Sequence, residues 1–99
     1  MRTVLSLWKG EITIRPTGRA LMRLIVEETA AAHGVTVAEM MGPRRIRRIA
    51  HARQEAMATI YAETKFSYPQ VGEFFGRDHT TVIHAVRRVA ERRLDETKQ

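Results

Sequence analysis

The sequence predicts an all-α domain of about five helices, the last two of which form a helix-turn-helix. Apolar residues recur at helical spacing in several separate segments. Residues that favour helix N-caps precede these segments at Thr17, Thr36, Ser67 and Asp78. A single glycine, Gly76, separates the last two segments, as a tight turn between two helices requires.

The first eighteen residues are ambiguous. Residues 3–8 and 11–14 are short, partly alternating and β-prone, and Lys9-Gly10 lies between them. A small hairpin, an arm packed on the helical body and a flexible tail all fit this pattern. We favour a loosely ordered arm over residues 1–18, with Trp8 anchored on the body, and a helical domain over residues 19–96.

The first long helix is expected from Arg19 to Ala32, between Thr17 as N-cap and Gly34 beyond its end. Its predicted core-facing residues are Leu21, Leu24, Ile25, Thr29 and Ala32. Thr36 and Glu39 have capping-box spacing, so a short helix is expected over residues 37–41, ended by Gly42-Pro43.

The third helix is expected from Ala50 to Thr64, after an extended basic loop over residues 44–48. Ser67 and Gln70 form a second capping-box pattern that opens a helix ending near Phe75. The last helix should run from an Asp78 N-cap to about Asp95. Its predicted core-facing residues are Val82, Ile83, Val86, Val89 and Ala90, with His84, Arg87, Arg88 and Glu91 on the other side.

The composition limits the classes of function. The 99 residues suit one small domain, and the absence of cysteine excludes disulfides, thiolate metal sites and a cysteine nucleophile. The apolar clusters are too short to span a bilayer, and residues 1–10 lack the apolar region of a signal peptide. We therefore expect a cytoplasmic, nucleoid-associated protein with no membrane contact.

Positive charge is concentrated in the second half of the chain. Residues 42–94 carry eleven basic and five acidic groups, and fourteen of the seventeen basic residues of the chain are arginine. Arginine presents a planar fork that pairs bidentately with phosphate or guanine. This bias favours an anionic polymer as partner, although an arginine-rich genome would also produce it.

The first turn of the last helix carries polar side chains that could contact DNA bases. Asp78, His79, Thr80 and Thr81 surround this turn, where helix-turn-helix proteins present base-reading groups. Aspartate can accept from a cytosine amine, histidine can donate or accept, and threonine can place its methyl beside a thymine methyl. The alternative is that Asp78 and Thr81 only cap the helix and His79 faces solvent.

The arginine cluster is the second candidate site. Arginines at 44, 45, 47 and 48 on an extended loop could enter a narrow minor groove or hold phosphates. Arg53 and Gln54 add phosphate donors near the start of the next helix. A solvated charge run and a nuclear localisation signal remain alternatives, but two basic regions flanking one helix-turn-helix favour DNA.

A family resemblance follows from one segment, Gly76-Arg77-Asp78-His79-Thr80-Thr81-Val82-Ile83-His84-Ala85. It closely resembles the signature of domain IV, the DNA-binding domain of the bacterial replication initiator DnaA. The likeness extends from about Leu21 to Arg93. It implies a Trp-repressor-like helical fold that binds a short non-palindromic DnaA box in duplex DNA as a monomer, with no cofactor.

The resemblance also implies roles for individual residues. Asp78, His79 and Thr80 would read bases in the major groove, and Arg45 would enter the minor groove. Phosphate contacts would come from Arg53, Gln54, Pro69, Thr81 and Arg88, to which the cluster adds Arg44, Arg47 and Arg48.

The chain departs from the family pattern at two positions. Many initiators have two glycines before the Arg-Asp-His motif, whereas Phe75 is followed by Gly76 alone. We expect this shorter turn to tilt the recognition helix. A lysine expected to contact phosphate is Tyr61 here, and this change should weaken backbone affinity.

We expect the protein to bind duplex DNA sequence-specifically at DnaA-box-like sites and thereby to regulate replication initiation or transcription. The sequence has no Gly-x-x-x-x-Gly-Lys-Ser/Thr segment that would bind ATP, so a stand-alone DNA-binding domain is expected. No nucleophile pattern or paired carboxylates accompany Asp78 and His79, and His79 and His84 lie apart around the helix, so neither catalysis nor a metal is expected. The initiator or another regulator could bind the N-terminal arm. The alternative is a helical adaptor for protein partners with a weak or vestigial DNA face.

Overall fold

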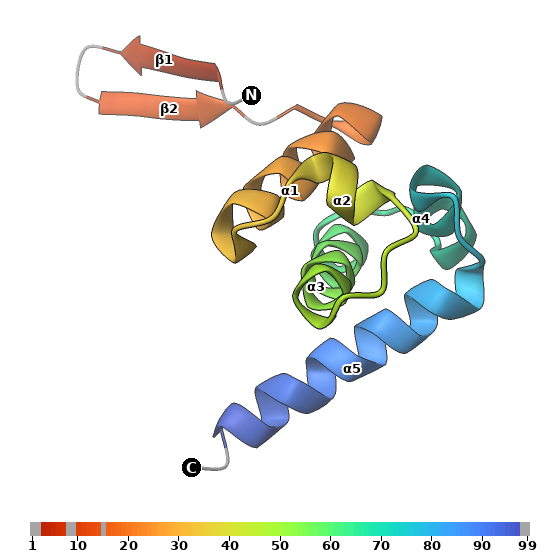
Figure 1. The fold of residues 1–99 in the computed structure, drawn as a ribbon. Helices are drawn as coiled ribbons and strands as arrows, with labels where there is room; N and C mark the ends of the chain where they lie inside the picture. Colours follow the sequence, from red (N-terminus) through yellow and green to blue (C-terminus); the bar gives the residue numbers. More distant parts are fainter. Residues whose placement is uncertain (1–2, 8–9, 15, 98–99) are drawn as a thin grey trace.

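A computed structural model describes residues 3–7, 10–14 and 16–97, with the side chains of residues 16–97. Among these residues, five helices follow a two-stranded hairpin (Figure 1). The helices are α1 (Gly18–His33), α2 (Val37–Met41), α3 (Arg47–Glu63), α4 (Tyr68–Phe75) and α5 (His79–Thr97). The prediction of a five-helix body ending in a helix-turn-helix is confirmed.

The hairpin pairs strand β1 (Thr3–Leu7) with strand β2 (Gly10–Ile14) in antiparallel register, Thr3 opposite Ile14 and Leu7 opposite Gly10. Of the three arrangements that the sequence left open, β1 and β2 form the small hairpin, while the loosely ordered arm over residues 1–18 that we favoured stays a prediction as to its order. The β-prone residues on both sides of Lys9-Gly10 can satisfy each other's backbone groups by pairing. Trp8 lies outside the described residues.

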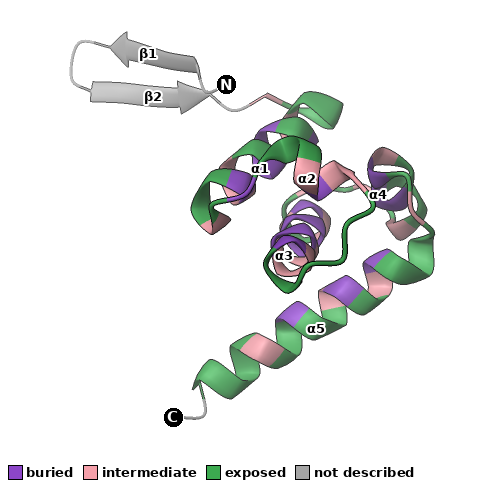
Figure 2. Cartoon of the chain, viewed as in Figure 1, coloured by how far each residue is buried: buried purple, intermediate pink, exposed green. Residues whose placement is uncertain are grey.

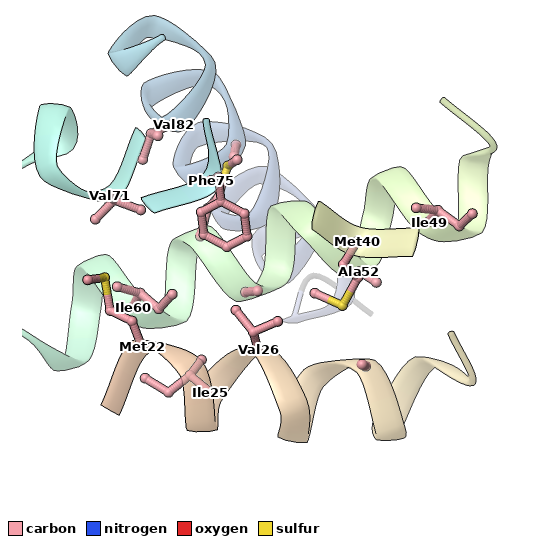
Figure 3. Close-up of a cluster of buried hydrophobic side chains, with 14 of the residues drawn as sticks. Met22, Ile25, Val26, Met40, Ile49, Ala52, Ile60, Val71, Phe75 and Val82 are labelled. Atoms are coloured by element: carbon pink, nitrogen blue, oxygen red, sulfur yellow. The ribbon is translucent and has the colours of Figure 1, made fainter. Parts of the chain in front are cut away.

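Helix α3 occupies the centre of the helical body and contacts the four other helices (Figure 1). Ala52 and Ala56 of α3 are fully buried, and such small side chains allow neighbouring helices to approach closely. The core around them, drawn in Figure 3, also includes Met22, Ile25, Val26, Met40, Ile49, Ile60, Val71, Phe75 and Val82. Both long flanking helices are thus fixed on one central helix.

Both predicted capping boxes are present. The Thr36 amide donates to Glu39 Oε1 at 2.9 Å, and the Glu39 amide donates back to Thr36 Oγ1 at 3.0 Å. Ser67 and Gln70 make the equivalent pair at the start of α4, with distances of 2.8 and 3.3 Å. These caps fix where α2 and α4 begin, and α4 is the first helix of the helix-turn-helix.

The start of α3 differs from the prediction. The helix begins at Arg47 and not at Ala50, with Ile46 at the N-cap position and no capping hydrogen bond from a side chain. Arg47 and Arg48 therefore lie in the first helical turn, and only Arg44 and Arg45 belong to an extended loop. The sequence rules missed this start because a basic first turn opposes the helix dipole and Ile46 is not a capping residue.

The buried faces of α1 and α5 are displaced from the predicted ones. In α1, Met22, Val26 and Ala30 are buried with Leu24 and Ile25, whereas Ala32 is exposed and Thr29 is only partly buried. In α5, the buried residues are Val82, Ala85 and Val89, and Ala90 is exposed. Helix α5 buries only this narrow stripe, while His84, Arg87, Arg88 and Glu91 are exposed as predicted (Figure 2).

Candidate nucleic-acid interface

The turn of the helix-turn-helix is built on two glycines. Gly76 ends α4 with a φ of 67°, in the left-handed region, and the Arg77 amide donates to the Gly72 carbonyl at 2.8 Å. A Cβ on Gly72 would lie 2.6 Å from the Arg77 carbonyl oxygen. Only glycine lets the turn come this close to α4. One glycine after Phe75 thus suffices to end α4 in the left-handed cap conformation.

The helix tip after this turn carries three exposed polar side chains, of Asp78, His79 and Thr80. The Asp78 Oδ1 atom lies 3.2 Å from His79 Nδ1, and the Thr80 hydroxyl donates to Asp78 Oδ2. This hydroxyl, the charge of His79 and the nearby backbone amides lower the pKa of the Asp78 carboxyl. Asp78 is therefore an ionised acceptor, and the side chains of Asp78 and His79 are 66% and 51% exposed, so the tip is open to a ligand.

Thr81 lies one position further into α5 and is exposed. Its amide donates to the Asp78 carbonyl at 3.1 Å, which closes the first turn of the helix. Asp78 thus has the N-cap position that the sequence predicted.

The arginine loop lies on the same side of the molecule as this tip. Gly42, Arg45, Gly76, Asp78 and Thr81 are among the residues lining one open cavity of about 700 Å³. The backbone between α2 and α3 runs past the α4–α5 turn (Figure 1). The structure therefore brings together the two predicted base-reading groups, the helix tip and Arg45.

Arg53 is buried, although a contact with phosphate was predicted for it. The residue is 7% exposed, its Nε donates to the Met40 carbonyl at 2.7 Å, and its Nη2 donates to the carbonyls of Gly42 and Arg44 at 3.0 Å. Burial, followed by the charge of Arg77, lowers the pKa of Arg53. These contacts give Arg53 a structural task, which is to hold the backbone that carries Arg44 and Arg45.

Gln54 and Thr81 line a smaller cavity of about 190 Å³ together with Arg53, Arg77 and His84. The side-chain oxygen Oε1 of Gln54 accepts from Arg92 Nη1 at 2.9 Å, so the Gln54 side chain is fixed by α5. Its amide nitrogen remains the group suited to a phosphate. The structure thus places these two predicted phosphate-binding residues side by side.

The remaining predicted phosphate-binding residues lie at the surface. Pro69 is exposed in the first turn of α4, and Arg88 is exposed on α5. Arg44, Arg47 and Arg48 are exposed around the start of α3. Figure 2 shows the loop between α2 and α3, which carries Arg44, as a continuous exposed segment in front of α3. None of these side chains is withdrawn into the core.

Tyr61, which replaces the expected lysine, stacks on Tyr68. The ring centroids are 4.1 Å apart and the ring planes differ by 8°. Interaction with the Tyr61 hydroxyl raises the pKa of Tyr68. This position therefore carries an uncharged aromatic pair between α3 and α4, and the expected loss of DNA-backbone affinity stays a prediction.

Sequence reasoning missed the role of two arginines. Arg77 Nη2 donates to the Gly42 carbonyl at 2.6 Å, and Arg92 contacts both Gln54 and Glu55. The partners lie 35 to 38 residues away along the chain. No local pattern could reveal such contacts, because the first depends on how the α4–α5 turn lies against the end of α2 and the second on how α3 and α5 pack.

The described residues contain no group of three side chains that could hold a metal ion. Within the same residues, no helix has the length and apolar character to cross a membrane.

Comparison with known proteins agrees with this geometry. The family model of the bacterial DnaA protein helix-turn-helix matches residues 22–89. The DnaA replication initiator of Paraburkholderia xenovorans is 41% identical over 96 residues, which cover 84% of this chain and 18% of that initiator. Those of Ralstonia pickettii and Nitrosomonas eutropha are 39% and 44% identical, over 89% and 73% of this chain and 19% and 16% of their own lengths.

The chain thus spans less than a fifth of the length of these initiators. The matched segment contains most of α1, all of α2, α3 and α4, and α5 as far as Val89, and with them the arginine loop and the helix tip. The chain belongs to the family of bacterial DnaA helix-turn-helix domains.

Proposed function

We propose that this protein binds duplex DNA at DnaA-box-like sites. The tip of α5 enters the major groove, where Asp78, His79 and Thr80 read base edges, and Arg45 enters the neighbouring minor groove. The observation that carries this proposal is the shared cavity, lined by both Arg45 and Asp78. A loop arginine and a helix tip on one side can contact adjacent grooves of one duplex.

Phosphates flank these base contacts in the proposed complex. Arg44, Arg47 and Arg48 bind DNA phosphates on one side of the helix tip. Arg88 and the protein main chain around Pro69 bind DNA phosphates on the other side. Gln54 and Thr81 bind a phosphate between them, beside Arg53. Exposed arginines suit such contacts, since phosphate contacts position a protein on DNA without reading sequence.

The biological role follows from occupancy of the sites. We propose that the protein acts as a monomer in the cytoplasm, associated with the nucleoid, and regulates replication initiation or transcription without catalysing a reaction. The replication initiator or another regulator could bind through residues 1–18. The names of the relatives, all replication initiators, support this context.

The test is discrimination between a duplex with a DnaA box and a scrambled duplex of equal length. The unaltered chain should prefer the box, and His79→Ala should reduce the preference by about 1–3 kcal/mol because one base contact is lost. Binding to both duplexes is measured by fluorescence anisotropy at fixed salt. An unchanged ratio of affinities in His79→Ala would refute base reading by the helix tip.

A further inference from the structure

The Gly42 carbonyl oxygen accepts from two guanidinium groups. Arg53 Nη2 donates to it at 3.0 Å and Arg77 Nη2 at 2.6 Å. Gly42 ends α2, Arg53 belongs to α3, and Arg77 lies in the turn between α4 and α5. Three separate parts of the fold therefore meet at one backbone oxygen.

Arg77 also donates a hydrogen bond to the end of α4, the helix that precedes it. Its Nη1 donates to the carbonyl of Phe75, the last residue of α4, at 3.0 Å. One planar group thus bridges the end of α4 and the beginning of the arginine loop. Because the guanidinium fork is rigid, it sets the distance between these two backbone segments.

The two DNA-directed groups lie at the two ends of this bridge. Arg45 follows three residues after Gly42, and Asp78 directly follows Arg77. The backbone before Arg45 is also held by Arg53, which donates to the Arg44 carbonyl at 3.0 Å. A change in the bridge would therefore alter the spacing between Arg45 and the helix tip.

We infer that Arg77 is a positioning residue that holds Arg45 at a fixed offset from the tip of α5. This inference rests on the proposed DNA binding and adds a determinant of specificity to it. Arg77 is not needed as a base-reading group in this role. It allows both grooves to be contacted at once, so that the loop does not have to be ordered when DNA binds.

The first experiment uses the free protein. Arg77→Lys keeps the charge, but a single ammonium on a flexible stem cannot hold the Phe75 and Gly42 carbonyls in one fixed plane. Backbone amide order parameters of Arg44, Arg45 and Ile46 should fall from about 0.85 towards about 0.6. Arg93→Lys, at the far end of α5, is the matched control and should leave them unchanged. Unchanged order parameters in Arg77→Lys would overturn the inference.

The second experiment is a double-mutant cycle on binding to a DnaA box. Arg77→Lys should weaken binding about tenfold when Arg45 is present, as expected for loss of a hydrogen bond from a charged donor. In an Arg45→Ala background, the same substitution should have an effect of less than about twofold, because the group that it positions is gone. Equal effects in both backgrounds would show a role independent of Arg45 and overturn the inference.

The two experiments separate this inference from the proposed function. If the unaltered chain does not prefer the box over a scrambled duplex, the proposed function fails, and the order parameters alone then test the bridge. If Arg77→Lys unfolds the chain, as far-ultraviolet circular dichroism would show, Arg77→Gln replaces it. Gln cannot span both carbonyls either, so ordered loop amides in that variant would equally overturn the inference.

Discussion

Arginines with the same charge have different tasks in this domain because they differ in burial. Arg44 and Arg45 are exposed and can reach a ligand, whereas the Nε and Nη2 atoms of Arg53 donate to backbone carbonyls. A buried guanidinium that ends on carbonyl oxygens orders the loop that carries the exposed ones. The burial of each residue, and not the density of charge in the sequence, decides between these tasks.

Removal of the buried guanidinium should therefore destabilise the fold. Arg53→Ala leaves the carbonyls of Met40, Gly42 and Arg44 without this donor, and we expect the free energy of unfolding to fall by about 2–4 kcal/mol. Chemical denaturation followed by circular dichroism measures this change. Arg88→Ala is the control, because an exposed arginine should change stability by less than about 0.5 kcal/mol. Equal stabilities of the two variants would contradict the structural task of Arg53.

His51 should make stability depend on pH. Burial first, then the charges of Arg92 and Arg47, lowers the pKa of His51 below its ordinary value of 6.5. The unfolded chain therefore binds more protons between the two pKa values, so this contribution to stability is complete above about pH 6.5 and is lost as the pH falls through the folded pKa.

The test compares melting temperatures at pH 7.5 and pH 5.5 in the unaltered chain and in His51→Gln. The difference between the two pH values should be smaller in the variant, because glutamine does not titrate. His84→Gln, at an exposed position on α5, controls for general loss of a histidine. An equal pH dependence in the unaltered chain and His51→Gln would show that His51 is not responsible.

At the scale of elements, the α4–α5 turn depends on a close approach that a side chain would block. Gly72→Ala places a methyl group 2.6 Å from the Arg77 carbonyl oxygen, which is backbone and cannot move alone. We expect a loss of about 1–3 kcal/mol of stability, typical of overpacking, together with weaker box binding because the tip of α5 shifts. Thermal unfolding and box affinity measure both effects.

Glu73→Ala is the matched control for this substitution, since Glu73 is the neighbouring exposed residue of the same helix. It should change stability by less than about 0.5 kcal/mol. A Gly72→Ala variant as stable as Glu73→Ala, with unchanged box affinity, would mean that the turn tolerates a displaced backbone.

The sequence predicted the elements that have local signals. The capping boxes at Thr36 and Ser67 and the glycine at Gly76 gave the positions of α2, α4 and the turn, because these interactions involve residues three or four positions apart. The start of α3 was wrong, because neither Ile46 nor the basic first turn is a start signal. The predicted face of α1 was wrong at Ala32, since packing against α3 and not periodicity alone selects the buried stripe.

The sequence predicted which residues belong to the candidate site, but it did not predict that the helix tip and the arginine loop lie together. Local sequence suggested the polar tip and the arginine loop separately. Their meeting at one cavity, and the bonds of Arg53 and Arg77 to Gly42, depend on contacts between residues 11 and 35 positions apart. Such contacts follow from the packing of α2, α3 and the α4–α5 turn, which no short segment encodes.

At the scale of the whole molecule, the charge distribution predicts how binding depends on salt. The net charge of +6 lies mainly in residues 42–94, which include the arginine loop, the tip and α5. DNA binding through about six phosphates would release condensed counterions and give a log–log slope of affinity against salt of about −5. An adaptor that binds protein partners through its helices would show almost no dependence of duplex binding on salt.

A salt titration of duplex binding separates these two outcomes. One substitution on α5 tests in addition whether a defined phosphate contact contributes to the slope. Arg88→Ala should weaken binding to box and scrambled duplexes alike and reduce the magnitude of the slope by about one, because it removes a single phosphate contact. Arg93→Ala removes the same charge near the far end of α5, where Arg93 Nη2 lies 3.5 Å from Glu55 Oε1, and should leave the slope unchanged. If both variants lower the slope equally, the response reflects total charge and not a defined DNA-binding face. A flat response in the unaltered chain would favour the adaptor.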